Sequence, residues 1–381
     1  MVSRDIKFVL GTFLIWRILL FVFLFLGLTF LPLQRNFLGG EIANYQSSPW
    51  FWAWANFDGQ HYLSIAQKGG YGFGQQAFFP LFPSLIKFLG GIFGGGLASL
   101  NLAGLVISNV AFILALVGLY KLMRLDFSER ITRLTMILVL AFPVSFYFGS
   151  VYTESLFLAF VVWSFFLAKK NKWLYASVLG GLAAATRVIG VLLLPVLFIE
   201  LLKKSKFNVL DKRYLYLLLI PFGLFAFMYY LYQTYGDPLL FIRALPGFGE
   251  QRSASPILLP QVFYRYIFKI LPAVNYSYFP AAFTTVMEFL VGGGLLILAV
   301  LAFKKLDLSY SLFLASGYLI PTLSGSFSSL PRYALVLFPA FVLLAIYLEK
   351  ASGIIKLMAV SIFAVGLCMA TALFVRGYWV S

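Results

Sequence analysis

An almost unbroken apolar run extends over residues 8–33, and comparable runs recur along the rest of the 381-residue chain. Apolar residues make up 62% of the sequence and charged residues only 11%, whereas a soluble globular protein is about half apolar and about a quarter charged. So few polar side chains cannot cover this apolar mass in water. A soluble enzyme, a nucleic-acid-binding domain and a disordered scaffold are therefore excluded, and the chain is predicted to be an all-α, polytopic membrane protein.

Clusters of Lys and Arg between the apolar runs predict the topology, because such residues collect in cytoplasmic loops. Arg4 and Lys7 place the N-terminus in the cytoplasm, and the first apolar run is too long for the core of a signal peptide. If the later clusters lie on the same side, the chain crosses the membrane about eleven times and ends outside. These clusters lie at 121–133, 169–172, 203–213, 304–305 and 350–356.

This path requires two crossings between residues 134 and 168, and two more between 173 and 202, where the helices must be short or broken. The remaining crossings are predicted near 100–120, 214–235, 286–303, 309–325, 332–348 and 357–375. No linker or fixed-period repeat divides the chain, so residues 1–381 are interpreted as one membrane domain.

Two long segments are predicted to lie outside, at about 34–97 and 236–285. Within the first, residues 78–96 are apolar but interrupted by prolines and glycines, which favours an interfacial or re-entrant helix. Trp50, Trp52 and Trp54 are interpreted as an aromatic belt at the membrane surface.

The rare residues limit the possible chemistry. His61 and Cys368 are the single residues of their types, so an internal disulfide and a Cys/His zinc site are excluded. Seven of the 13 acidic residues fall among Lys and Arg at cytoplasmic ends. The external candidates are Glu41, Asp58, Glu154, Asp237, Glu250 and Glu288. No paired acidic motif stands among them, so no metal is indicated.

Asp58 stands in FDGQHYLSIAQKGGY (57–71). A helix that begins at Asp58 would place His61 and Tyr62 on the same face as this carboxylate, one turn away. Asp58 could also cap the helix through backbone N–H groups, and this role is compatible with catalysis. Lys68, near the end of the segment, is a further candidate for substrate binding.

Tyr152 and Glu154 stand at an external turn in SVYTESLF (150–157), and Asp237 in Gly-Asp-Pro is interpreted as a turn residue. Arg187 lies in the break between two short helices, and Arg332, followed by Tyr333, lies at another external turn. An arginine at membrane depth needs a partner. A salt bridge to Glu154, snorkelling to headgroups and the binding of a phosphate all remain open for Arg187.

An external carboxylate beside basic side chains suits one chemistry. The carboxylate would deprotonate an acceptor hydroxyl, and the basic groups would stabilise a departing phosphate. The transition state would resemble an oxocarbenium ion. A membrane location matches a sugar donor carried on a polyisoprenoid.

The motifs resemble those of the PIG-V family of GPI mannosyltransferases. FDGQHYLSIAQKGGY followed by AFFPLFPSL is similar to the family's first signature, and VYTESLF, TRVIG, GDPLLFIRA and RYALVLFPAF follow in the family's order. The resemblance implies a GT-C-type glycosyltransferase fold, a lipid-phosphate-linked mannose donor, inversion at the sugar and no metal requirement. It also implies that Asp58 is the base and that Glu154, Arg187 and Arg332 line the donor site.

The chain is shorter than eukaryotic members of that family, which favours a prokaryotic member in the cytoplasmic membrane with its site on the external face. GPI is then not the expected acceptor. A glycolipid or glycan acceptor stays open, and the sugar could differ from mannose.

Two other functions compete with this hypothesis. A lipid or polyisoprenoid-phosphate transporter would place ionisable residues near the midplane and often contains inverted repeats. Here the candidate acids cluster at the external boundary, which favours the enzyme. A non-catalytic assembly partner would give no reason for Asp58, His61 and Arg187 to converge.

Overall fold

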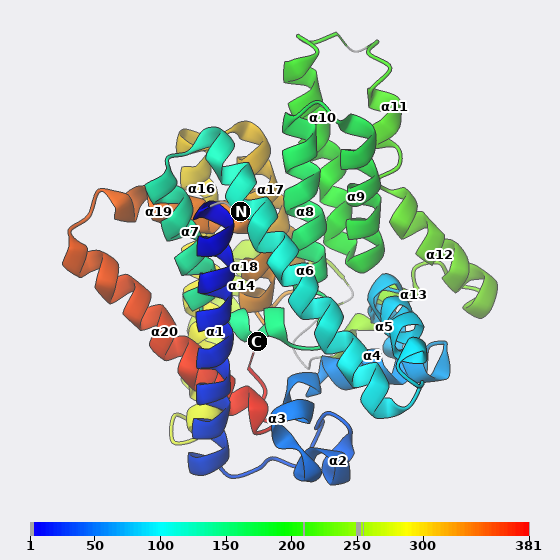
Figure 1. Cartoon of the computed structure of the whole chain (residues 1–381), viewed down its shortest axis with the longest axis vertical. Coiled ribbons are helices and arrows are strands. Elements are labelled where there is room, and N and C mark those ends of the chain that lie inside the picture. The colour runs from blue at the N-terminus through cyan, green and yellow to red at the C-terminus, as the bar shows by residue number, and fades with distance from the viewer. Residues whose placement is uncertain (1–3, 209, 249–252, 254, 381) are drawn as a thin grey trace.

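The computed structural model describes residues 4–208, 210–248, 253 and 255–380, and this part of the chain contains helices but no strand (Figure 1). Five segments are single helices or nearly continuous helical stretches that are long and apolar enough to cross a membrane. They are α1 (Arg4–Phe30), α6 (Leu97–Asp126), α11–α12 (Tyr214–Tyr235), α16 (Phe279–Lys305) and α20 (Gly353–Val375). The bent pair α18 (Leu330–Val336) and α19 (Phe338–Glu349), which turns by 77°, makes a sixth if it is one span.

Shorter helices occupy the other predicted crossings. They are α7 (Glu129–Ala141), α8 (Glu154–Lys169), α9 (Trp173–Thr186), α10 (Leu193–Lys204) and α17 (Leu308–Thr322). The predicted break between 173 and 202 is confirmed, because the 3-10 turn η4 (Val188–Leu192) separates α9 from α10. Each of the eleven predicted crossings thus contains a helix. Among the described residues, however, only five or six of these helical segments are long and apolar enough to count as membrane spans.

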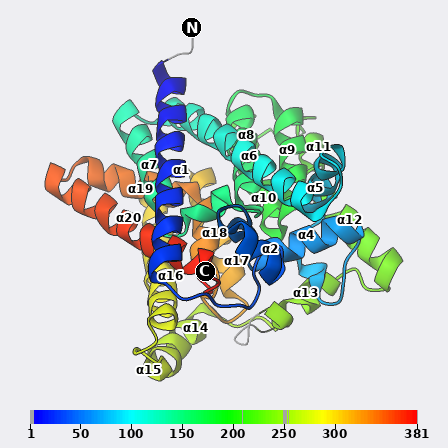
Figure 2. The same cartoon turned by 60° about the horizontal axis from the view of Figure 1, so that its bottom comes forward.

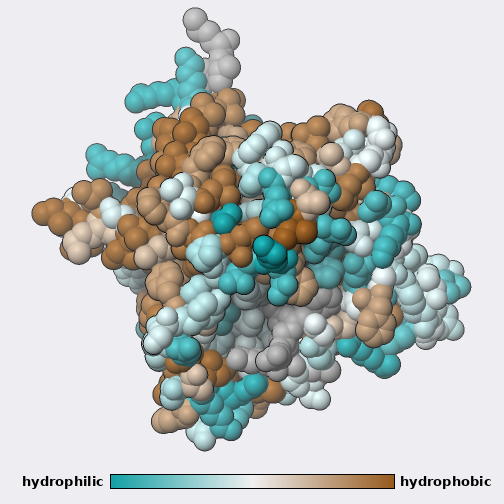
Figure 3. Space-filling model, turned by 90° about the horizontal axis from the view of Figure 1, so that it is seen from below, coloured by the Kyte–Doolittle hydropathy of each residue, from teal (hydrophilic) through white to brown (hydrophobic). Residues whose placement is uncertain are grey.

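The first of the two segments predicted to be external forms short helices at one end of the bundle, at the bottom and lower right of Figure 1. They are α2 (Glu41–Ser47), α3 (Pro49–Trp52), η1 (Ala53–Ala55), α4 (Asp58–Lys68), η2 (Gln75–Ala77) and α5 (Leu81–Ile92). The second external segment contributes α13 (Leu240–Arg243), η5 (Leu245–Phe248), α14 (Leu259–Arg265), the π-helical turn η6 (Tyr266–Ile270) and α15 (Leu271–Ala273). Seen from below, this end carries hydrophobic residues mainly on one side and hydrophilic residues across its middle (Figure 3).

The aromatic-belt interpretation is wrong for two of the three early tryptophans. Trp50 is 54% exposed, but Trp52 and Trp54 are only 4% and 1% exposed. The Trp54 ring meets Phe21 of α1 edge-on at 5.8 Å. The Trp54 indole therefore anchors this segment to the bundle, and the buried Trp52 indole packs within the segment, next to Phe51 and Gly40, instead of lying at a lipid surface.

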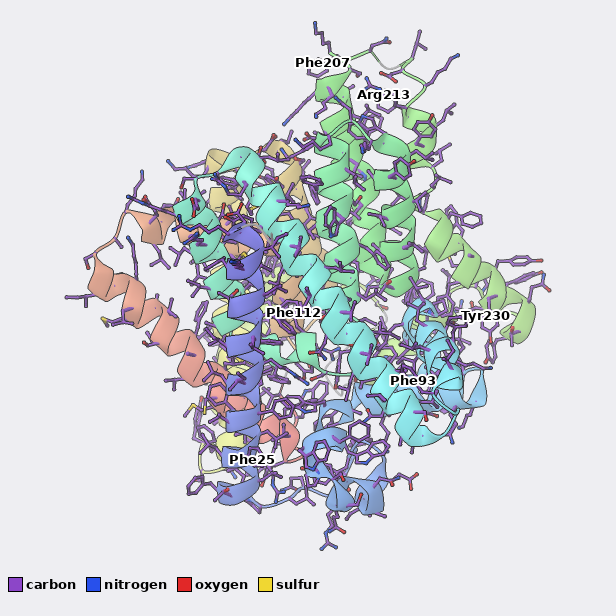
Figure 4. All side chains as sticks on the ribbon, in the orientation of Figure 1. Phe25, Phe93, Phe112, Phe207, Arg213 and Tyr230 are labelled. Atoms are coloured by element: carbon purple, nitrogen blue, oxygen red, sulfur yellow. The ribbon has the colours of Figure 1, made fainter. Side chains whose placement is uncertain are left out.

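Small residues and aromatic rings bring the central helices together. A Cβ on Gly118 of α6 would lie 2.7 Å from the indole nitrogen of Trp163 on α8, so the two helices approach where α6 has no side chain. Phe112 of α6 (Figure 4) stacks on Phe148 with ring centroids 4.3 Å apart. Phe148 belongs to η3 (Ser145–Gly149), the turn that leads into α8. This packing sets the position of Glu154, the first residue of α8.

Candidate active site

A cavity of about 390 Å³ lies between α4, the α9–η4 junction, α13 and the helices α17 and α18. Asp58, Tyr62, Arg187, Arg332 and Tyr333 all line it. Much of the remaining wall is apolar and comes from the η2–α5 turn, η4, α13 and the end of α17. The cavity therefore joins an apolar wall to a small set of charged groups, as ligand sites commonly do.

The backbone at Asp58 is held in an uncommon conformation. Phe57 has a φ of +57°, in a region that bulky residues rarely adopt, and its N–H donates to Phe37 O at 2.8 Å. The side chain of the preceding residue, Asn56, donates to Phe374 O and accepts from Gly39 N, both at 2.8 Å. Strain of this kind persists where neighbouring structure enforces it, and it concentrates at functional sites.

The predicted capping role of Asp58 is wrong. Phe57 occupies the N-cap position of α4, and no side chain makes a capping bond there. The helix begins at Asp58 itself, so this carboxylate points to a tertiary partner instead of to its own backbone. Its Oδ2 atom accepts from Arg332 Nη1 at 2.7 Å.

Four charged side chains form a continuous network. Arg332 donates to Asp58, and through Nε and Nη2 to Glu154 Oε1 at 3.1 and 3.0 Å. Arg187 Nη1 donates to the same Glu154 oxygen at 2.7 Å. The Glu154 side chain is 0% exposed, and those of Arg332 and Arg187 are 7% and 12% exposed. Two acids and two bases alternate, so the buried charges compensate one another.

The hydrogen bonds on Glu154 are unevenly distributed. Oε1 accepts from both arginines, whereas Oε2 is buried without a hydrogen-bond partner in the described part of the chain. The salt bridge proposed for Arg187 is present. Arg187 also donates to Thr153 Oγ1 at 3.2 Å, again through Nη1. Its Nε and Nη2 groups make no hydrogen bond to the described residues and remain available to a ligand.

Aromatic rings support both guanidinium groups. Arg332 lies over the rings of Tyr147 and Tyr152, at 4.8 and 4.9 Å from their centroids, and Arg187 lies 4.8 Å from that of Tyr333. Such contacts favour a cation over a ring face when both are desolvated. Ser329, the N-cap of α18, has a φ of +63°. Uncommon backbone conformations thus precede both Asp58 and Arg332.

Four of the predicted site residues lie off the cavity wall. Glu154, expected to line the donor site, is instead fully buried behind the two arginines that it binds. His61 stacks on Phe78, with centroids 5.0 Å apart, and its Nδ1 atom is 3.2 Å from Gln75 Nε2. Lys68 is exposed at the end of α4. Tyr152 is fully buried behind Arg332 and donates its hydroxyl hydrogen to Asn56 O at 2.8 Å. Helical spacing placed His61 beside Asp58 in sequence, but the packing of η2 turns the imidazole toward Phe78 and Gln75.

Burial affects the two titratable neighbours of Asp58 in α4. Burial lowers the pKa of His61, and the negative charge of Asp58 partly opposes this change. Burial also raises the pKa of Tyr62, as do the nearby carboxylates. Both side chains are therefore held in their neutral forms near pH 7.

Several residues that shape the site were not among those predicted from the sequence. Thr153 touches Arg187, Tyr147 supports Arg332, Asn56 holds the backbone before Asp58, and Trp379 lines the cavity. Thr153 stands inside the VYTESLF motif and could have been chosen from it. Trp379 follows the last apolar run, and no local pattern indicates its place in the site. In the described ranges, no three His, Cys, Asp or Glu side chains gather closely enough to hold a metal ion.

Comparison with solved structures identifies the fold. ArnT from Cupriavidus metallidurans bound to undecaprenyl phosphate aligns with a TM-score of 0.53 and 15% identity, over 96% of this chain and 77% of that one. The apo structure of the same protein aligns with a TM-score of 0.54 and 15% identity, over 96% of this chain and 76% of that one. The oligosaccharyltransferase of Archaeoglobus fulgidus, in the apo form, aligns with a TM-score of 0.47 and 14% identity, over 98% of this chain and 56% of that one. A comparison with curated protein sequences finds no match.

The helical architecture thus defines a polytopic membrane protein with the GT-C glycosyltransferase fold. The sequence model of the mannosyltransferase (PIG-V) family matches residues 2–322, and the chain belongs to that family. Asp58, Glu154 and Arg187 fall within the matched residues. Arg332, Tyr333 and Trp379 follow them, so the last part of the chain completes the cavity.

Proposed function

We propose that this protein transfers a sugar, with mannose as the first candidate, from a polyprenyl-phosphate-linked donor to a hydroxyl group of a glycolipid or glycan. The observation that carries the proposal is the cavity in which Asp58 meets the Arg332–Glu154–Arg187 network. Membership of a mannosyltransferase family supports a sugar as the transferred group. The related fold of ArnT, solved with undecaprenyl phosphate, supports a lipid phosphate as the carrier.

Asp58 has the geometry of a general base. Arg332 binds its Oδ2 atom, whereas Oδ1 makes no hydrogen bond to the described residues and belongs to a side chain that lines the cavity. Oδ1 would take the proton of the acceptor hydroxyl while the acceptor oxygen attacks C1 of the donor sugar. The bond from C1 to the phosphate oxygen breaks, and its electron pair leaves with polyprenyl phosphate. One displacement at C1 inverts its configuration.

The arginines would hold the phosphate of the donor. Arg187 has Nε and Nη2 available, and Thr153 and Tyr333 lie beside it. Glu154 holds both guanidinium groups from behind through one oxygen atom, which aims them at a common region. They would take up the charge that develops on the leaving phosphate, so the scheme requires no metal, and activity should survive excess EDTA.

The exposed apolar part of the cavity wall suits a lipid. Val188, Ile242 and Ile320 line the cavity and are 38%, 38% and 41% exposed. Exposed apolar side chains beside buried arginines would accept an isoprenoid chain and its phosphate together. We place the cavity on the external side of a prokaryotic cytoplasmic membrane, with the N-terminus inside, because the basic clusters are predicted to lie in cytoplasmic loops.

The test uses purified protein and short-chain polyprenyl-phosphate-mannose, with a panel of glycolipid and glycan acceptors. The Asp58→Asn variant should retain the fold and release polyprenyl phosphate at least about a hundredfold more slowly, since a general base contributes roughly 10²–10⁴-fold. Asp237→Asn is the matched control. Asp237 also pairs with an arginine, Arg243 at 2.9 Å, and is 21% exposed against 19% for Asp58, but it lies off the cavity wall.

Equal release by the wild type and Asp58→Asn would assign the chemistry to another carboxylate. Movement of the lipid across liposomes without bond cleavage would instead establish a transporter.

A further inference from the structure

The chain after α20 is held by hydrogen bonds to several neighbouring segments. Gln34 N donates to Arg376 O at 2.9 Å, Arg376 Nε donates to Leu31 O at 2.8 Å, and Thr284 Oγ1 donates to Trp379 O at 3.2 Å. The hydroxyl of Tyr147 donates to Val380 O. In the turned view the C-terminal end lies beside α1 and α2 (Figure 2). These contacts hold the backbone of residues 376–380 in place.

The side chains along this segment differ sharply in exposure. Tyr378 and Val380 are 7% and 0% exposed, whereas Trp379 between them is 37% exposed and lines the cavity. Trp379 is the one tryptophan of the described chain on that wall. A fixed backbone that presents a large aromatic surface to a cavity is pre-organised for a ligand, because little conformational entropy remains to be lost on binding.

Contacts place Trp379 at one end of the charged network. Its ring meets Phe57 edge-on at 5.1 Å, and Phe57 directly precedes Asp58. Asp58 contacts Arg332, Arg332 contacts Glu154, and Glu154 contacts Arg187. Trp379 therefore adjoins the proposed base, whereas the arginine with free donors adjoins the apolar residues of η4.

We propose that Trp379 is the platform on which a sugar ring of the acceptor stacks, and this inference rests on the proposed function. A pyranose has an apolar face of C–H groups and polar hydroxyls at its edge. The face would cover the exposed indole, and an edge hydroxyl would then point to Asp58. An isoprenoid chain would use the indole but bring no hydroxyl to the carboxylate. Trp379 is thus a specificity-determining residue for a glycosidic acceptor.

The kinetic test uses octyl α-mannoside and octyl β-glucoside as acceptors, with polyprenyl-phosphate-mannose as donor. Trp379→Ala should raise the acceptor KM about tenfold or more, as the loss of an aromatic anchor does, and leave the donor KM within about twofold. Trp379→Phe should recover most of the affinity. Trp50→Ala is the control, because Trp50 is 54% exposed and lies off the cavity wall.

A second measurement does not depend on turnover. Either octyl glycoside, titrated into protein in lipid nanodiscs, should quench the tryptophan fluorescence of the wild type and of Trp50→Phe in a saturable way. Trp379→Phe should lose this quenching. Because it uses Trp379→Phe, the fluorescence measurement still tests whether Trp379 binds a sugar if Trp379→Ala fails to fold.

The two arms separate this inference from the proposed function. If the wild type releases no polyprenyl phosphate, the proposed function fails, and the fluorescence arm alone decides whether Trp379 binds a sugar. If the wild type transfers sugar but Trp379→Ala keeps its acceptor KM, or raises the donor KM instead, the inference is overturned and the function stands. Equal quenching in the wild type and Trp379→Phe, or no quenching by either glycoside, also overturns it.

Discussion

At the scale of single residues, the site depends on buried charges that hold one another. Glu154 has no exposed surface, and its charge is compensated by Arg187 and Arg332 at 2.7 and 3.0 Å. Taking such charges out of the solvent is expensive, and they persist because each has an oppositely charged neighbour. The orphan oxygen Oε2 indicates that Glu154 serves to position the arginines more than to complete its own hydrogen bonding.

Removing this carboxylate should leave two buried cations beside each other. We expect Glu154→Gln to lower the free energy of unfolding by about 3–5 kcal/mol, the usual effect of breaking a buried pair. The double variant Glu154→Gln/Arg187→Gln should regain part of the loss, because one excess cation is gone. The free energies of unfolding of the single and the double variant can be measured in detergent, with near-UV circular dichroism as the signal.

The control for this pair of variants is Asp211→Asn, which breaks the surface pair between Asp211 and Arg213. Arg213 lies far from the site, in the loop at the top of Figure 4. Surface pairs contribute little, so this variant should behave as the wild type does. A Glu154→Gln protein as stable as the wild type would show that Glu154 does not compensate the arginines.

The pKa of His61 predicts how the stability of the external segment depends on pH. Burial holds this pKa below the usual value of about 6.5. The fold therefore favours neutral His61; this contribution is complete above about pH 6.5 and is lost as the pH falls through the lowered pKa. Between pH 7 and pH 5, the melting temperature of the wild type should fall more than that of His61→Gln. Parallel curves for the two proteins would contradict this assignment.

At the scale of elements, the short helices around the site are positioned by close packing with their neighbours. Gly190 in η4 is an example, since a Cβ there would lie 2.4 Å from the Ala183 carbonyl carbon of α9. The tight η4 turn is what carries Arg187 to the cavity wall. Gly118 has the same function between α6 and α8, where the indole of Trp163 fills the space of the missing side chain.

Enlarging Gly118 should separate these two helices. Gly118→Ala is expected to destabilise the protein by about 1–3 kcal/mol through overpacking. Gly293→Ala on α16 is the matched control, because no heavy atom lies within 4 Å of the added Cβ. Thermal unfolding in detergent should show a lower melting temperature for Gly118→Ala only. Equal melting temperatures would mean that the α6–α8 contact relaxes around the methyl group.

At the scale of the whole molecule, the short helices α2–α5 lie toward one end of the bundle, and the α6–α7 and α10–α11 connections, where basic residues cluster, lie toward the other (Figure 1). Helix α4 contributes Asp58 and Tyr62 to the cavity. Under the proposed function, this separation suits a lipid substrate that enters from the bilayer and reacts at its outer surface. It also predicts a definite orientation in the membrane.

Single cysteines introduced into a Cys368→Ala background should report that orientation. Ser47→Cys, in the exposed part of α2, should react with a membrane-impermeant maleimide in intact cells. Lys206→Cys, in the exposed turn after α10, should react only after permeabilisation. The reverse pattern would move the active site to the cytoplasmic side and contradict the charge argument.

Local pattern predicted much of the fold but little of the geometry of the site. The broken segment at 173–202 was predictable, because charge on both sides left too few residues for two full helices. Asp58, Glu154, Arg187 and Arg332 could be chosen because ionisable residues are rare in this chain. The pairing of Arg187 with Glu154 was one of the alternatives that the sequence left open. The partners of Arg332 could not be predicted, since it meets Asp58 across 274 positions and Glu154 across 178. Helical spacing correctly placed His61 one turn from Asp58 in α4. It could not show that His61 lies off the cavity wall, because that depends on the packing of η2 and Phe78 against α4.

The membrane character, the all-helical class and the short list of candidate charges were determined by the sequence alone, because hydropathy and charge are properties that residues carry wherever they pack. Tertiary structure decided which acid faces which arginine, that Lys68 stays outside the cavity, that Trp52 and Trp54 are buried, and that Trp379 lines the cavity. Each of these depends on contacts between segments far apart in the chain, and such contacts leave no local period or composition by which to predict them.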